Sequence, residues 1–82
     1  RIIRFSLRPG QVMREHHAPH SPVYIVILRG QGYFTGGDGK EQLLGPETLL
    51  VLDVGETHSV RADKEDLVFV TFLHGVPEEI TR

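Results

Sequence analysis

The chain has 82 residues, nine of them Lys or Arg and eleven Asp or Glu, which gives a net charge of −2. This length predicts one domain, residues 1–82, with a single hydrophobic core. The basic residues are scattered, the apolar runs fall far short of the ~20 residues of a membrane span, and no signal-peptide pattern is visible. We therefore expect a cytoplasmic protein that binds neither nucleic acid nor a membrane.

The first part of the chain predicts two strands and a histidine-bearing loop. Apolar and polar residues alternate over residues 1–7, the period of a half-buried strand, and Arg8-Pro9-Gly10 follows as a turn. Residues 11–15 are expected to form a short second strand. Residues 16–22 carry three histidines and two prolines, and proline disfavours both a helix and a central strand. We expect this segment to be a strand end that runs into a loop.

The middle of the chain predicts a buried strand and a hairpin. Residues 23–28, V-Y-I-V-I-L, are apolar or of high β propensity on both faces. Such a strand is covered on both faces, here by the barrel interior and by a second layer or a partner chain. Residues 33–35 and 41–44 flank a glycine-rich turn at 36–40, whose Asp38-Gly39 pair is typical of a hairpin.

The last part predicts three more strands, at residues 48–52, 58–61 and 67–73. A loop at 53–57 and a charged, solvated turn at 62–66 separate them, and residues 75–82 form a polar tail. His74, at the end of a strand, is expected to be structural or exposed. About eight short strands at regular spacing, without a useful helical period, predict an all-β sandwich or barrel.

Several glycines and histidines lie at spacings that resemble those of the cupin family, whose fold is a small jelly-roll β-barrel. The first cupin motif places His-x-His five residues after a Gly, and a Glu six residues before a closing Gly; Gly10, His16 and Gly30 match. In the second motif, Gly55 and His58 match. The resemblance covers residues 8–73 and implies a small single-domain cupin of about eight strands.

The resemblance also implies a metal site, of which the chain keeps two of four ligands. His16 and His58 stand at ligand positions, whereas the second histidine of the first motif falls on Ala18 and the glutamate falls on Val23. In the second motif, Glu47 stands where the family has its first glycine. The fold implied by the family is therefore better supported than its metal site.

A third ligand is required, because most well-formed protein metal sites use at least three. His20, with the same strand parity as His16, is the natural candidate, and His17 is the rival if the register slips by one residue. The chain has no cysteine, so thiolate ligands are excluded. Imidazole ligands suit a divalent transition metal such as Zn, Ni, Cu, Fe or Mn better than Mg or Ca.

Three functions are consistent with these residues. The first is a metal-binding cupin that acts on a small organic molecule in the barrel, as an oxygenase- or isomerase-type enzyme, with His16, His20 and His58 holding the metal. The second is a non-catalytic cupin that binds a small ligand or acts as a sensor. The third is a structural or interaction domain with a solidly packed barrel, whose main role is dimerisation. No catalytic side chain is assigned, since the serines lack a Gly-x-Ser-x-Gly context and no phosphate-binding loop precedes a helix.

Two further expectations concern the surroundings of the site and the assembly. Asp53 and Glu56 lie close to His58 in sequence, where an acidic side chain either orients an imidazole or keeps the loop soluble. The doubly apolar strand at residues 23–28 and the alternating strand at 1–7 predict a homodimer. A small core gains from such a partner.

Overall fold

The computed structural model describes residues 1–16 and 21–74, and for residues 15 and 16 it describes the backbone alone. These residues contain eight strands, as expected, and no helix that could cross a membrane. The strands are β1 (Ile2–Leu7), β2 (Val12–His16), β3 (Val23–Arg29), β4 (Gly32–Thr35), β5 (Glu41–Leu44), β6 (Leu49–Leu52), β7 (His58–Ala62) and β8 (Leu67–Leu73). The expected polar tail at residues 75–82 lies outside the described residues.

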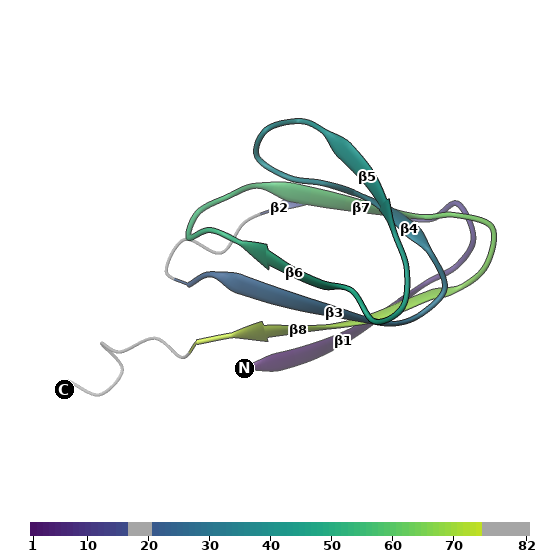
Figure 1. Cartoon of the computed structure of the whole chain (residues 1–82), viewed down its shortest axis with the longest axis horizontal. Coiled ribbons are helices and arrows are strands. Elements are labelled where there is room, and N and C mark those ends of the chain that lie inside the picture. Colours follow the sequence, from purple (N-terminus) through teal and green to yellow (C-terminus); the bar gives the residue numbers. More distant parts are fainter. Residues whose placement is uncertain (17–20, 75–82) are drawn as a thin grey trace, which may run out of the picture.

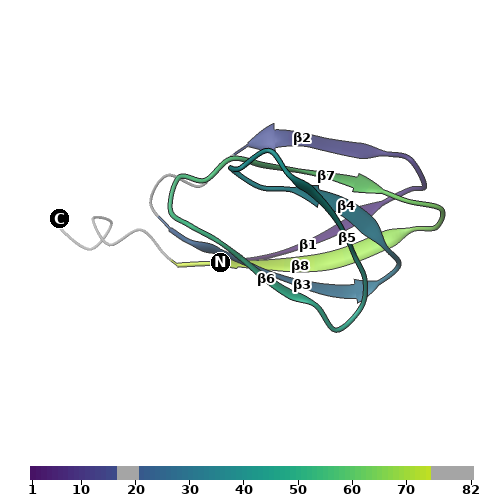
Figure 2. The same cartoon turned by 45° about the horizontal axis from the view of Figure 1, so that its top comes forward.

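The eight strands form two antiparallel sheets of four, which face each other in Figures 1 and 2. The first sheet has the order β1-β8-β3-β6 and the second has the order β2-β7-β4-β5. Successive strands along the chain mostly cross from one sheet to the other, which gives the jelly-roll arrangement that the sequence predicts. No strand ladder joins one sheet to the other within the described residues, so the barrel wall is open at both seams.

The core lies between the sheets because each strand alternates inward and outward side chains. Phe69 of β8 is at its centre, with 0% exposure; its ring stacks on Phe5 at 5.1 Å between centroids and meets the Phe34 ring edge-on at 5.8 Å. Burying a side chain of this kind contributes about 2–3 kcal/mol. The other core residues include Leu7, Val23, Ile25, Ile27, Leu52, Val60, Ala62 and Leu67.

Several strand ends differ from the expected ranges by one residue, among them the ends of β2 and β7. The second strand reaches His16, one residue beyond the range expected from the sequence. Ala62 was expected in the solvated turn, but it closes β7 with 0% exposure. Both residues take part in antiparallel pairing between neighbouring strands, which the local sequence does not reveal.

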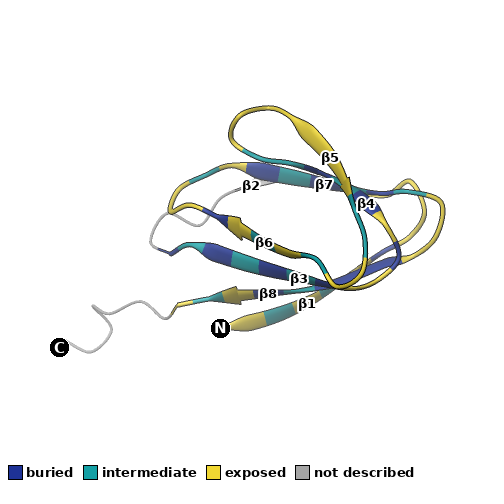
Figure 3. Cartoon of the chain, viewed as in Figure 1, coloured by how far each residue is buried: buried dark blue, intermediate teal, exposed yellow. Residues whose placement is uncertain are grey.

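The outer face of β3 has no second layer of the described chain over it, which leaves the partner chain as the expected cover. Val23, Ile25 and Ile27 point inward and are buried, whereas Tyr24 and Val26 are half-buried and Leu28 is exposed. Figure 3 shows the resulting alternation along the strand. Within residues 1–16 and 21–74, no helix or further strand lies over this face, since all eight strands belong to the two sheets.

The backbone explains the motif glycines. Gly10, Gly30 and Gly55 have φ angles of 76°, 82° and 78°, in the left-handed region that favours glycine. Glu47, which stands at the remaining glycine position of the second motif, also has a positive φ, 69°. Gly30 meets a second constraint, because a Cβ there would lie 2.0 Å from the carbonyl oxygen of Asp66. All four positions where the family motifs have glycine therefore have a positive φ, including position 47, where this chain has glutamate.

Candidate functional site

His58 is the histidine that the structure places at the barrel wall. It opens β7, is 4% exposed, and alternates with Val60 and Ala62, which are buried in the core. Its side chain therefore belongs to the inner face of the second sheet. A buried imidazole between apolar neighbours is well shielded from water, a setting in which histidine acts as a metal ligand or as a polar anchor.

The backbone of His16 is the antiparallel partner of His58. An unbroken register continuing from Val12 opposite Arg61 and Met13 opposite Val60 would place residue 15 opposite His58. A register shift between Met13 and His16 inserts one residue and brings position 16 there instead. Two of the positions that the sequence proposed as ligands are thus juxtaposed across β2 and β7.

The third ligand position cannot be placed in the same way. His17 and His20, the two candidates from the sequence, lie outside the described residues, as does the side chain of His16. Within the part of the chain that is described, no group of three His, Asp or Glu side chains is arranged to hold a metal ion. Val23, at the position of the family's glutamate ligand, is an inward-facing core residue with 5% exposure. The described donors therefore fit the family's metal only in part.

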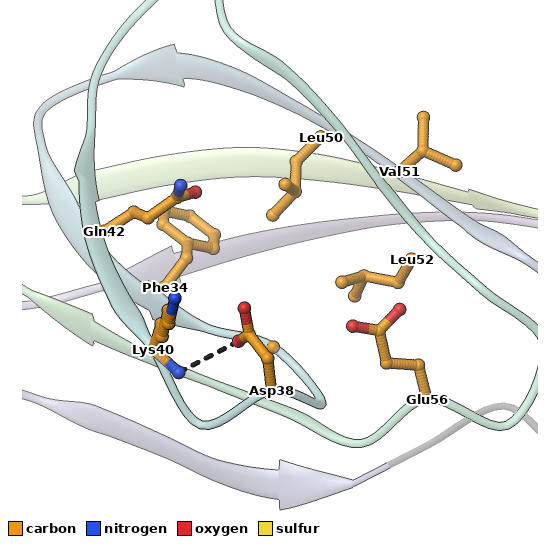
Figure 4. A pocket seen from close by; sticks show the side chains of 9 residues that line it. Phe34, Asp38, Lys40, Gln42, Leu50, Val51, Leu52 and Glu56 are labelled. Atoms are coloured by element: carbon orange, nitrogen blue, oxygen red, sulfur yellow. Dashed lines mark hydrogen bonds between the residues drawn. The ribbon is translucent and has the colours of Figure 1, made fainter.

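A second feature is a pocket of about 160 Å³ at the seam between β5 and β6. Its apolar wall is formed by Phe34, Leu50 and Leu52, which belong to the inner faces of the two sheets. The polar rim carries Asp38, Lys40, Gln42 and Glu56, from the β4–β5 hairpin and the loop before β7. Figure 4 shows the Glu56 carboxylate beside Leu52 and the Asp38 carboxylate on the side of Lys40, whose backbone N–H donates a 2.9 Å hydrogen bond to its Oδ1.

Glu56 ties the two loops of this pocket together. Its Oε2 accepts a 2.8 Å hydrogen bond from the backbone N–H of Gly37, and its Oε1 accepts a 2.8 Å bond from that of Asp53. These hydrogen bonds lower the pKa of Glu56 below its ordinary value of 4.5, and the bond from Gly37 has the larger effect. The charge of His58 lowers the pKa slightly further, whereas desolvation opposes the change. The carboxylate is consequently ionised at neutral pH and fixed in place.

The glycine pair of the hairpin is explained by this contact. A Cβ on Gly36 would lie 2.9 Å from Oε2 of Glu56, and one on Gly37 would lie 2.9 Å from its Cγ. Neither glycine has a positive φ, unlike Gly39, whose φ is 77°. Gly36 and Gly37 therefore leave room for the glutamate side chain, and Gly39 supplies the backbone conformation of the turn.

From the sequence, Asp53 and Glu56 are expected either to orient the His58 imidazole or to keep the loop soluble. The structure gives Glu56 two backbone donors and makes the Asp53 backbone one of them. His74, expected to be structural or exposed, is exposed, and its ring stacks on Tyr24 at 5.8 Å between centroids. The seam pocket was not foreseen, because its residues come from three separate segments; the adjacent Gly36 and Gly37 were the one local hint of a close approach.

Two antiparallel sheets in jelly-roll order, with a histidine on the inner wall, define a small β-barrel domain of the jelly-roll class. The sequence matches the cupin domain family over residues 3–73, and the chain belongs to that family. The comparison with curated proteins finds no match.

Solved structures share the fold. A protein from Thermotoga maritima described as a predicted oxalate decarboxylase is 26% identical with a TM-score of 0.83, over 92% of this chain and 65% of that one. A cupin family protein from Methanocaldococcus jannaschii is 17% identical with a TM-score of 0.83, over 99% of this chain and 74% of that one. The CENP-C cupin domain of Drosophila melanogaster is 16% identical with a TM-score of 0.79, over 89% of this chain and 59% of that one. The chain thus spans less than two-thirds of the first and third.

Proposed function

We propose that this cupin domain binds a divalent transition metal (Zn, Ni, Cu, Fe or Mn) through His16, His58 and His20, beside a small organic molecule between the sheets. The observation that carries the proposal is the pairing of His16 with His58 across β2 and β7. Directly opposed residues of an antiparallel pair have Cβ atoms about 4.5–5.5 Å apart on one face, a spacing from which two imidazoles reach a common ion.

The third ligand of this proposal comes from the segment that follows β2. His20 is the first choice, and His17 is its rival. With Val23 in place of the family's glutamate, the site has one negative charge fewer, which leaves positions for water or for an oxygen-bearing ligand. When bound, a metal in such a site supplies Lewis-acid or oxygen-binding chemistry. The likeness to a predicted oxalate decarboxylase supports an enzyme acting on a small organic molecule. The oxygenase or isomerase type of reaction is what the family resemblance implies.

Elemental analysis of untagged protein tests this proposal. We expect about one transition metal per chain, lost in His16→Ala and His58→Ala and retained in His74→Ala, the matched control at an exposed histidine. Comparing His20→Ala with His17→Ala identifies the third ligand. Cobalt substitution gives an independent readout, since the visible spectrum reports nitrogen ligation without any assay of activity. Protein free of metal after growth in supplemented medium refutes the proposal.

The apolar outer face of the first sheet favours a second function, homodimerisation. Its residues form continuous rows across all four strands, because the strand registers align them. One row is Ile2, Phe72, Tyr24 and Val51, and the next is Arg4, Val70, Val26 and Leu49. Large exposed apolar patches on soluble domains mark interaction surfaces, and a two-fold dimer presents the same patch from both copies.

Light scattering on the purified chain tests this second function. We expect a dimer that Leu49→Lys converts to a monomer, because Leu49 is 63% exposed at the β6 edge of this face. Leu43→Lys is the matched control: Leu43 is 47% exposed, but it lies on the outer face of the other sheet. A wild-type monomer at high concentration, or equal effects of the two substitutions, contradicts the proposed interface.

A further inference from the structure

The seam pocket between β5 and β6 contains none of the proposed metal ligands, so what it binds is a separate question. Its volume, about 160 Å³, is well below the ~300 Å³ at which drug-sized ligands begin. An apolar wall faces a rim that carries charges of both signs. A ligand that matches this lining has a short apolar body and carries both a positive and a negative group.

The space beside Gly36 is suited to an ammonium group. The point that a Cβ of Gly36 would occupy lies 2.9 Å from Oε2 of Glu56, 3.9 Å from Oδ1 of Asp38 and 4.0 Å from Cδ2 of Leu52. Two carboxylate oxygens and one methyl group therefore converge on a space that a side chain would otherwise fill. Both oxygens already accept one backbone hydrogen bond, from Gly37 and Lys40 respectively, which holds them in place and leaves each a further acceptor position.

The neighbouring part of the rim is suited to a carboxylate. Lys40 and Gln42 line the same pocket and carry an ammonium and an amide N–H₂, both hydrogen-bond donors. Among the side chains that the structure describes, the one ion pair joins Arg61 to Glu41, so none of these carboxylates neutralises the Lys40 ammonium. Oppositely charged groups thus share the pocket without pairing with each other.

We propose that the seam pocket binds a small zwitterion of amino-acid size, with its ammonium group in the space beside Gly36, its carboxylate on Lys40 and Gln42, and its apolar body against Phe34, Leu50 and Leu52. The proposal goes beyond the metal site and does not depend on it. Binding of such a small molecule at a half-open site is expected to be weak, with a dissociation constant on the order of millimolar.

The experiment is an amide-resolved NMR titration of the whole chain with L-valine and its two singly charged analogues. Isobutylammonium lacks the carboxylate of valine, and 3-methylbutanoate lacks its ammonium group. We expect shifts centred on Gly36, Gly37 and Asp38, with valine binding about threefold or more tightly than either analogue. Addition of EDTA should leave these shifts unchanged, which separates this result from the fate of the metal proposal.

Three variants assign the two charged groups of the ligand. Asp38→Asn keeps the acceptor for the Lys40 N–H and should weaken valine and isobutylammonium about threefold, leaving 3-methylbutanoate unchanged. Lys40→Met should weaken valine and 3-methylbutanoate and not isobutylammonium. Gly36→Ala, at a position without a positive φ, should abolish the shifts by filling the space. The control, Glu65→Gln, removes a charge from a loop at the other end of β4 and should change nothing.

Contrary results overturn the proposal. It fails if valine causes no shifts at tens of millimolar, if all three probes bind equally, or if Glu65→Gln weakens valine as much as Asp38→Asn does. Preferential binding of one singly charged analogue over valine also overturns it, because the pocket would then recognise a simple cation or anion. If Gly36→Ala alters the folded spectrum, the Asp38 and Lys40 variants decide the outcome.

Discussion

Replacing Gly30 with alanine separates two reasons for a glycine that usually occur together. Gly10 and Gly30 have similar positive φ angles, 76° and 82°. A Cβ at Gly10 meets nothing within 4 Å, whereas a Cβ at Gly30 lies 2.0 Å from the Asp66 carbonyl oxygen and 3.1 Å from the Leu67 Cα. Both atoms are backbone, so the turn between β7 and β8 must move to admit the new methyl group.

The expected magnitudes follow from these two terms. A left-handed alanine costs about 1–2 kcal/mol, partly offset because alanine restricts the unfolded chain by about 0.4–1 kcal/mol. Gly10→Ala should therefore lower the free energy of unfolding by about 1 kcal/mol. Gly30→Ala adds an overpacking cost of about 1–3 kcal/mol, for a total of about 2–4 kcal/mol. The difference of about 2 kcal/mol corresponds to roughly 8–16 °C in Tm for a domain of this size.

Urea denaturation followed by far-UV circular dichroism measures both variants, since the chain has no tryptophan to report by fluorescence. The Gly10→Ala variant is the matched control, because it carries the same residue change and nearly the same φ. If the two variants lose equal stability within about 0.5 kcal/mol, the contact with the β7–β8 turn is not what requires glycine at position 30.

Two other predictions concern Glu47 and Glu56. Glu47→Gly relieves a left-handed non-glycine residue, with φ of 69°, and should raise the free energy of unfolding by up to about 1 kcal/mol in urea denaturation; a clear loss contradicts the backbone argument. The lowered pKa of Glu56 means that its stabilising effect is complete above pH 4.5, the ordinary value, and is lost as pH falls through the lower folded value. Thermal melts across this acid range should show a smaller pH dependence in Glu56→Gln than in the wild type; identical slopes would rule out the contribution of this carboxylate.

Much of the fold was predictable from local pattern. The two-residue period, the short apolar runs and the turn residues predicted eight strands at nearly the correct positions along the chain. The motif spacing indicated the family. The Asp38-Gly39 hairpin was likewise confirmed, with the positive φ at Gly39. These features depend on neighbouring residues in the sequence, which is why sequence alone reveals them.

The candidate site was less predictable, because it depends on contacts between distant strands. The position of His16 opposite His58 requires a register shift in β2, and nothing in the local sequence marks that extra residue. The alternation of side chains along a strand allowed for a shift of one residue in the register, but it did not show at which residue the shift occurs. Glu56 reaches across to Gly37, nineteen positions away in sequence, so the seam pocket also becomes visible only in three dimensions.

The alternation of strands between the two sheets has a consequence for how this domain can be divided. The first sheet takes β1, β3, β6 and β8, and the second takes β2, β4, β5 and β7. Every contiguous fragment long enough to hold several strands therefore carries incomplete parts of both sheets, and the first strand needs the last as its ladder partner. The chain has no autonomous half: a cut in any loop should leave two pieces that regain structure only by recombining with each other.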